Sequence, residues 1–500
     1  MAIPIRKTRT SLRLSREQSH REESLAPVFS SGHYVAAAVM SILFWLIMGT
    51  VSNTTVTTVM GVLVIGAVVM LSPLLLAQRQ IVAGLTVLAY LAALQPAIRA
   101  YIPALRYNIL EYALPLSVFF ILAQRRKVVL GIPTFFYLLY LGLELIGVIN
   151  AERLDIVRAV FFSSFTLFLI LLVADQIELP IGQMSHIWRG YLVGALSILV
   201  LLARILFSDA VITWTTASNT QFTAGMGPNQ VSFILSVAVF LALVLGDQAT
   251  GQGRWIYRLL AGIVAYFMVL TFSRGGLYIV IGAVLIYYLF FQRPQRSTWP
   301  VLFIFGGLLY AVLNLASDTT QGAVLERYSN LDTTNRLLLA QQGWQIFLDN
   351  PILGVGTANY HVAVASGNYF GAISGAHNEL IRAAAEHGIF GLVFWGLFAF
   401  ASLVLVLRSQ TGRFKALRVA FLFIAFTSMF YNGLKLIIQP LLILMALTLI
   451  PSDLPLTKKQ PDEISSANTS SYVARLQVTR KVRQQSSLKK SFVEPNDNQE

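Results

Sequence analysis

The stretch "NQVSFILSVAVFLALVLG", residues 229–246, decides the fold class of this chain. It contains no charged residue, and as a helix it is long enough to cross the ~30 Å hydrocarbon core of a bilayer. Similar runs recur along the 500 residues, of which 56% are hydrophobic and 12% charged, with a mean hydropathy of +0.67. A soluble domain would carry about twice that charged fraction. The sequence therefore predicts an all-α, polytopic integral membrane protein.

Hydropathy predicts about 12–14 transmembrane helices and one large extracytoplasmic helical loop. The third candidate span is the weakest, because Pro96 and Arg99 lie at its end. The candidate spans lie near 34–51, 56–77, 81–97, 107–123, 128–149, 156–174, 188–207, 229–246, 256–272, 276–291, 300–316, 389–407, 417–431 and 434–450.

Composition divides the chain into five parts. A basic tail (1–32) precedes the first spans (33–316), and the large loop (317–388) precedes the last spans (389–450). A polar, Ser-rich and basic tail (451–500) follows. Both tails are expected to be cytoplasmic and disordered, because they carry too little apolar surface to fold. The first apolar run is expected to stay as a membrane anchor, since no cleavage signal accompanies it.

Basic residues gather in every second predicted loop, for example in "QRRK" (124–127), "GRWIYR" (253–258) and "RSQTGRFKALR" (408–418). The positive-inside rule requires this pattern of a multi-pass protein with both termini in the cytoplasm. It explains the net charge of +14 better than nucleic-acid binding does, so no nucleic-acid partner is expected. Arg99 and Arg106 fall on a predicted outer loop and break the pattern. Either the third span is misdrawn or these arginines have another role.

Two outer segments carry arginines that are candidates for phosphate binding. In "TFSRGG" (271–276), Arg274 lies between two apolar runs. It is either a functional cation or a residue of a short interhelical turn that pairs with lipid phosphate. In the large loop, "NRLLLAQQGWQIFLDNP" predicts an amphipathic helix on the outer membrane face, with Arg336 in its first turn. The expected apolar stripe of that helix, preceded by capping Asp and Thr residues, is Leu337, Ala340, Trp344 and Phe347.

The stretch "GAHNELIRAAAEHGIFG" (375–391) supplies the candidate base, His377. Three of the six histidines (His361, His377 and His387) lie in the large loop (317–388), and histidine suits general-base work near neutral pH. A purely structural histidine is the alternative, and the spacing offers little support for zinc. Gly388 is expected to end the helix as its C-cap. Glu379, Glu386 and His387 are interpreted as helix-surface residues.

Two glycine-containing segments complete the outer features. "NTQFTAGMGPNQVSF" (219–233) predicts a loop, with Asn229 as the cap of the next helix. "NPILGVGTANY" (350–360) allows tight turns, but no strand precedes it, so a nucleotide site is not supported. The chain has no cysteine, which excludes disulfides and cysteine nucleophiles.

The outer-face features together indicate a chemistry. Arginines bind diphosphate by forked hydrogen bonds, and a nearby histidine can take a proton from an attacking hydroxyl. Arg274, Arg336 and His377 therefore suit group transfer from a lipid-linked diphosphate.

The motifs "TFSRGG", "NRLLLAQQGWQIFLDNPILGVGTANY" and "HNELIRAAAEHGIFG" resemble, in this order, the O-antigen ligase and O-antigen polymerase superfamily. The resemblance implies a glycosyltransferase of the bacterial cytoplasmic (inner) membrane that needs no metal and no cofactor. Its partners would be a polyprenyl-diphosphate-linked glycan, a lipid or glycan hydroxyl acceptor, and membrane lipids.

The resemblance also implies roles for single residues. Arg274 and Arg336 would hold the diphosphate, and His377 would activate the acceptor hydroxyl with Asn378 beside it for orientation. Members of the superfamily often have an arginine where this chain has Gln221. Arg204 could supply that missing contact.

Other functions stay open at this point. A polysaccharide-related transporter or flippase would place ionisable residues deep in several spans, where Glu111 and Glu144 are the main acids. A purely structural membrane subunit is the third possibility. The sequence does not separate ligase from polymerase, and it leaves the sugar, the linkage and the acceptor open.

Overall fold

The computed structural model describes residues 29–51, 54–102, 105, 109–125, 127–209, 211–290, 298–329, 336–366, 376–408 and 412–450. The chain divides into two compact units, Met1–Ser452 and Asp453–Glu500, and the second lies outside the described residues. The expectations for most of the 1–32 tail and for the 451–500 tail also fall outside them, as do those for Arg106 and for the side chain of Glu111.

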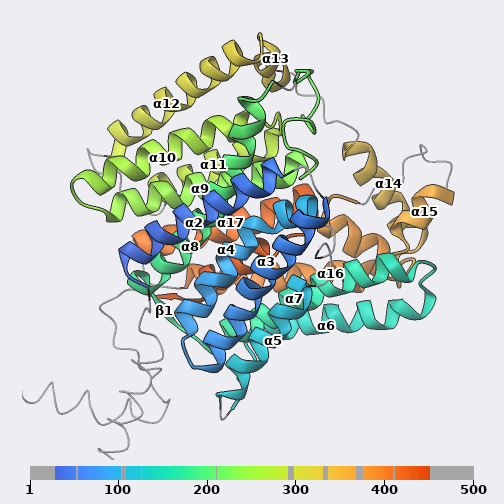
Figure 1. The fold of residues 1–500 in the computed structure, drawn as a ribbon. Coiled ribbons are helices and arrows are strands. Elements are labelled where there is room, and N and C mark those ends of the chain that lie inside the picture. The colour runs from blue at the N-terminus through green and yellow to red at the C-terminus, as the bar shows by residue number, and fades with distance from the viewer. Residues whose placement is uncertain are drawn as a thin grey trace, which may run out of the picture. The chain divides into compact units, whose positions relative to one another are not determined.

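Helices make up almost all of the described structure (Figure 1). The α-helices are α2 (Ser31–Thr50), α3 (Thr54–Ala77), α4 (Ile81–Tyr101), α5 (Ile109–Ala123), α6 (Ile132–Gly147), α7 (Leu154–Ala174), α8 (Ile181–Leu206), α9 (Pro228–Gln248), α10 (Gln252–Val269), α11 (Arg274–Leu285), α12 (Thr298–Thr319), α13 (Ala323–Ser329), α14 (Arg336–Asp349), α15 (Tyr360–Ser366), α16 (Glu379–Leu407), α17 (Arg413–Asn432) and α18 (Ile438–Thr448). Short 3-10 and π segments, η2 (Val148–Asn150) and η3 (Ile286–Phe290), extend α6 and α11, and strands β1 (Leu179–Pro180) and β2 (Leu449–Ile450) pair in parallel.

The fold class predicted from the sequence is confirmed. Each predicted span overlaps one of these helices. Among the described residues, nine helices are long and apolar enough to cross a membrane, and Leu114–Ala123, Arg274–Leu289 and Ile438–Thr448 form shorter apolar helices. The chain is therefore an all-α, multi-pass membrane protein.

Small residues let the central helices approach closely. Helix α4 is buried along most of its length and packs against α3 and α8. A Cβ atom on Gly190 or Gly194 of α8 would collide with the backbone carbonyls of Thr86 or Tyr90 on α4. In a membrane, where lipid removes most of the hydrophobic drive between helices, such close backbone packing stabilises the pair.

Helix α4 runs further than its predicted range. It continues through Pro96 to Tyr101, which places Arg99 in its last turn. Membrane helices tolerate an internal proline where neighbouring groups satisfy the backbone groups that it releases. The third span is therefore real, and Arg99 belongs to a helix end rather than to a loop.

Helix α16 does not end at Gly388, as the sequence predicted, but breaks there and continues to Leu407. Gly388 has a φ of 61° and a ψ of −148°, which a residue with a Cβ rarely adopts. The backbone of 351–356 pairs with this break: Val355 N–H donates to Ala385 O at 3.0 Å, and Ile389 N–H donates to Pro351 O at 2.8 Å. The break thus fixes the "NPILGVG" segment against α16.

The buried face of α14 differs from the predicted apolar stripe. Leu337 is 56% exposed and Trp344 is 44% exposed, whereas Phe347 is buried. The buried residues are Gln342, Gly343, Ile346 and Phe347. Gly343 decides this face, because only a residue without a Cβ fits against Ile381 of α16 and Tyr360 of α15. The predicted capping residues at 332–334 lie outside the described residues.

Candidate functional site

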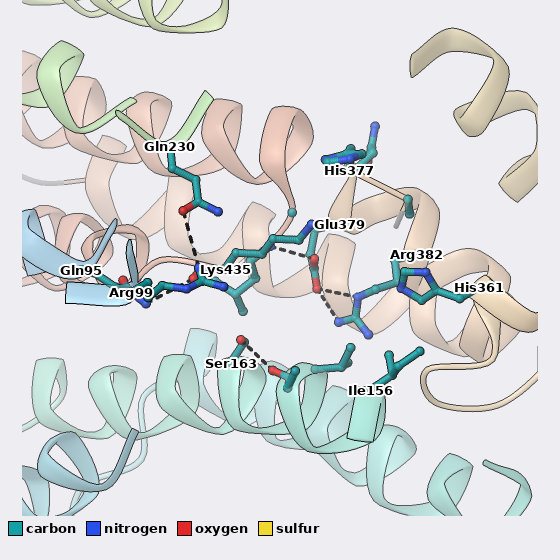
Figure 2. Close-up of a pocket in the computed structure, with 16 residues that line it drawn as sticks. Gln95, Arg99, Ile156, Ser163, Gln230, His361, His377, Glu379, Arg382 and Lys435 are labelled. Carbon is teal, nitrogen blue, oxygen red and sulfur yellow. Dashed lines mark hydrogen bonds and ion pairs between the residues drawn. The ribbon is translucent and has the colours of Figure 1, made fainter. Parts of the chain in front are cut away.

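Helix ends from distant parts of the chain surround a polar cavity of about 370 Å³ (Figure 2). The end of α4, the first turns of α7, α9 and α16, helix α15 and the turn between α17 and α18 contribute its walls. If the spans alternate in direction as the sequence predicts, all the helix ends that form these walls lie on the extracytoplasmic side. The polar residues that line it are Gln95, Arg99, Ser163, Gln230, His361, His377, Asn378, Glu379, Arg382 and Lys435.

His377 lies at the wall of this cavity, two residues before α16 begins. Its φ of 48° is unusual for a residue with a Cβ. Burial lowers the pKa of His377 to about 4, and the positive charges of Lys435 and Arg336 act in the same direction. Its Nδ1 atom is buried and has no hydrogen-bond partner among the described residues. The imidazole is therefore neutral at pH 7 and able to accept a proton.

Asn378 has a structural task that the sequence did not predict. Its Oδ1 atom accepts hydrogen bonds from the backbone N–H of Leu380 at 3.1 Å and of Ile381 at 3.2 Å, so Asn378 is the N-cap of α16. The cap fixes the start of the helix and, with it, the position of His377. Its predicted role in orienting an acceptor stays a prediction.

Arg274 and Arg336, which the resemblance assigned to one task, lie close to a third arginine. Arg274 opens α11 and Arg336 opens α14. Burial lowers the pKa of Arg327, on α13, and the nearby charges of Arg274 and Arg336 lower it further. The guanidinium of Arg336 lies 3.8 Å above the ring centre of Tyr431. Arg274, Arg327 and Arg336, here called the arginine cluster, offer several donors to one anion.

Sequence reasoning missed Arg327. It is 8% exposed, and its Nε donates to the carbonyl of Phe272 at 3.3 Å, which joins α13 to the "TFSRGG" turn. The only available signal was that Arg327 lies in the same large loop as Arg336. Nothing in the pattern of "AVLERYS" separates a buried arginine from a solvated one.

Asn229 is not the cap that the sequence predicted. Gly227 takes the N-cap position of α9 and Pro228 the first helical position. The Oδ1 atom of Asn229 instead accepts hydrogen bonds from the hydroxyls of Ser273 at 2.9 Å and Tyr431 at 2.8 Å. These bonds tie α9, α17 and the start of α11 together below Arg336.

Arg204 and Gln221 lie apart from this site. Arg204 is exposed in the last turn of α8, against Gly49 of α2. Gln221 is also exposed, and its Oε1 accepts a hydrogen bond from the backbone N–H of Thr213 at 2.9 Å. Neither residue lines the cavity. The structure therefore brings His377, Arg274 and Arg336 to one region, but not these two.

Glu379, Glu386 and His387 are buried, contrary to the interpretation as helix-surface residues. The guanidinium of Arg382 binds Glu386 Oε2 at 2.8 Å, Glu144 Oε1 at 2.8 Å and both hydrogen-bonds and ion-pairs with Glu379. Its Nη2 also donates to the Tyr140 hydroxyl at 3.0 Å. We call Arg382, Glu144, Glu379, Glu386 and Tyr140 the buried ion network. Glu379, Arg382 and Glu386, at i, i+3 and i+7 of α16, therefore face Glu144 of α6 and not water.

The two further histidines of this region have different surroundings. His387 packs edge-on against the ring of Tyr140, with 5.7 Å between ring centres. His361 lines the cavity, and burial lowers its pKa. Among the described residues, no three His, Asp or Glu side chains are placed to hold one metal ion.

The comparison with protein families bears on this region of the chain. Residues 259–396 match the family model for O-antigen ligase. The resemblance seen in the motifs is confirmed. This O-antigen ligase segment contains the arginine cluster, His377 and Arg382, whereas Arg99, Glu144 and Lys435 lie outside it. A search of curated proteins finds no match for the chain.

Proposed function

We propose that this protein is a glycosyltransferase of the bacterial cytoplasmic membrane that assembles polysaccharide. It moves a glycan from a polyprenyl-diphosphate carrier to a hydroxyl acceptor on the outer face. The observation that carries the proposal is the position of His377 within the O-antigen ligase segment. A neutral imidazole lies at the wall of a polar cavity, within electrostatic reach of Arg336 of the arginine cluster.

The reaction follows from these groups. The acceptor oxygen forms a bond to the anomeric carbon of the donor glycan while its proton passes to the imidazole of His377. The bond between that carbon and the diphosphate oxygen breaks, and the electron pair leaves with the diphosphate. The arginine cluster stabilises this growing negative charge through forked, charge-assisted hydrogen bonds.

A deletion strain tests the proposal directly. Loss of the gene is expected to change the surface glycan: full-length polymer stranded on the lipid carrier indicates a ligase, and single repeats on the acceptor indicate a polymerase. Purified protein in vesicles should then transfer glycan from the extracted lipid-linked donor. Unchanged glycans in the deletion strain would contradict the proposal, and vesicle uptake of donor without any product would favour a transporter.

The pH profile of transfer should carry the signature of His377. Because its pKa is about 4, the imidazole stays neutral through the range near pH 6.5 where an ordinary histidine becomes protonated. We expect kcat/KM to stay level as pH falls to about 5 and to drop about tenfold per unit below 4. Stability responds in another window: the unfolded chain binds this proton first, so folding loses free energy between about pH 6.5 and 4. A rate that falls at pH 6.5, measured in reconstituted vesicles, would contradict the assignment.

A further inference from the structure

The last turn of α17 carries a tyrosine, Tyr431, that contacts the arginine cluster from outside the O-antigen ligase segment. The guanidinium carbon of Arg336 lies 3.8 Å from the centre of its ring. Burial lowers the pKa of Arg327, and the nearby phenol of Tyr431 acts in the opposite direction. Tyr431 therefore lies beside two of the three arginines that the proposed function assigns to the donor.

The two glycines of "TFSRGG" make room for this ring. A Cβ atom on Gly275 would collide with the ring of Tyr431, so no larger residue fits at this position. A Cβ atom on Gly276 would likewise collide with Ser232 of α9. Because α17 packs against both α9 and α11, the glycine pair seats the ring of Tyr431 against the start of α11.

Hydrogen bonds fix the orientation of the ring. The hydroxyl of Tyr431 lies 2.5 Å from Ser273 Oγ and 2.8 Å from Asn229 Oδ1. Ser273 belongs to the "TFSRGG" turn, where it is 1% exposed, and Asn229 belongs to α9. Rotation of the tyrosine side chain away from Arg336 would break both contacts of its hydroxyl.

The turn that follows α17 is fastened as well. Gly433 ends the helix with a φ of 68°, and the side-chain amide of Gln439 donates to its carbonyl at 2.9 Å. Gln95 of α4 donates to the carbonyl of Lys435 at 3.4 Å. Helix ends tend to fray, and these bonds hold this end in place. The fold thus presents the ring of Tyr431 at a fixed position.

We propose that Tyr431 positions Arg336 for the diphosphate of the glycan donor. An aromatic ring takes up the face of a guanidinium and leaves the N–H donors at its edge for phosphate oxygens. The ring is also neutral, whereas a carboxylate in its place would compete with the diphosphate for the arginine. An arginine that is held in advance loses less conformational freedom when the anion binds, so the contact strengthens donor binding.

The inference rests on the proposed function and assigns part of the donor site to a residue beyond the O-antigen ligase segment. Neither Tyr431 nor Arg336 lines the cavity at His377. The contact should therefore act on the donor and leave the binding of the acceptor unchanged.

The test separates the ring from the hydroxyl and from the fold. Tyr431→Leu removes the ring and Tyr431→Phe keeps it, and each is also made together with Arg336→Gln. Tyr34→Leu is the matched control. Tyr34 also lies beneath a guanidinium, that of Arg189 at 5.9 Å, and its hydroxyl bonds His186, but it belongs to the first turn of α2 on the predicted cytoplasmic side.

Two quantities are measured for every variant. Fluorescence polarisation of the detergent-purified protein gives the Kd of a labelled polyprenyl diphosphate that carries no glycan. Transfer rates in reconstituted vesicles give the KM of the donor and of the acceptor. In addition, phenylalanines with one, two or three ring fluorines are placed at position 431, because fluorine withdraws electron density from the ring face and keeps its shape.

We expect Tyr431→Leu to raise the Kd and the donor KM about five- to tenfold, with the acceptor KM within about twofold of wild type. Tyr431→Phe and Tyr34→Leu should stay within about twofold, and Tyr431→Leu should add nothing to Arg336→Gln. The Kd should rise with each ring fluorine, a series that also decides the matter if the leucine variant does not fold.

Equal effects of Tyr431→Leu with and without Arg336 would mean that the tyrosine only supports the fold, and would overturn the inference. A Kd that ignores ring fluorination would do the same, as would a shift in the acceptor KM alone. A wild type that binds the labelled diphosphate but forms no product would remove the proposed function, while the Kd values still decide the role of Tyr431. A wild type that does not bind it would overturn both.

Discussion

Replacing His377 with alanine is expected to slow glycan transfer by about 10²- to 10⁴-fold while the protein stays folded and inserted. The imidazole is half-buried and neutral at the cavity wall, and on the proposed function alanine leaves the acceptor hydroxyl without a group to take its proton. Its Nδ1 atom makes no hydrogen bond within the described structure, so removing that atom breaks no hydrogen bond there. Initial rates in reconstituted vesicles measure the effect.

His186→Ala is the matched control for this variant. His186 lies in the second turn of α8 and hydrogen-bonds the Tyr34 hydroxyl at 2.9 Å, away from the cavity. Its loss should leave the transfer rate within about twofold of wild type, since His186 is not among the residues that line the cavity. Transfer at the wild-type rate by the His377 variant would remove the proposed base.

Replacing Arg382 with methionine is expected to destabilise the protein by about 3–5 kcal/mol. The change keeps much of the side-chain volume but leaves Glu144, Glu379 and Glu386 buried without their cation. A buried carboxylate without a cation must either take up a proton or draw in water, and both cost free energy. Thermal unfolding of the detergent-purified protein, followed by circular dichroism, measures the loss.

Arg153→Met provides the comparison at the surface. Arg153 also pairs with a carboxylate, Asp155 at 2.7 Å, but the two side chains are 50% and 66% exposed. An exposed pair contributes little to stability because water screens it, so this variant should unfold close to the wild-type temperature. If the Arg382 and Arg153 variants unfold alike, the buried ion network does not stabilise the fold.

Local pattern was enough to predict the membrane helices and to single out His377, whose role as the base stays a prediction. A run such as 229–246 predicts a membrane helix by itself, because an apolar helix of that length is stable in lipid whatever it packs against. His377 stood out since a polar cluster in an apolar chain needs a reason. Arg274 and Arg336 stood out for the same cause, and the structure places both near Arg327.

What the sequence could not reveal are the long-range partners. The pattern Glu379, Arg382, Glu386 is typical of a solvated helix face, and only contact with Glu144, 238 positions earlier than Arg382, turns it inward. Arg99 looked like an error in a span, because its neighbours Gln230 and Lys435 are far along the chain. The face of α14 was misjudged because Gly343, a residue without a side chain, decides the packing.

The fastening of Lys435 by Gln95 bears on how the enzyme is made in the cell. The two residues are 340 positions apart, so one cavity wall is complete only after the last helical hairpin has entered the membrane. A ribosome-bound chain that already displays His377 still lacks Lys435. On the proposed function, the growing polypeptide therefore does not transfer glycan until its synthesis is almost finished, and a chain truncated before α17 should be inserted yet inactive.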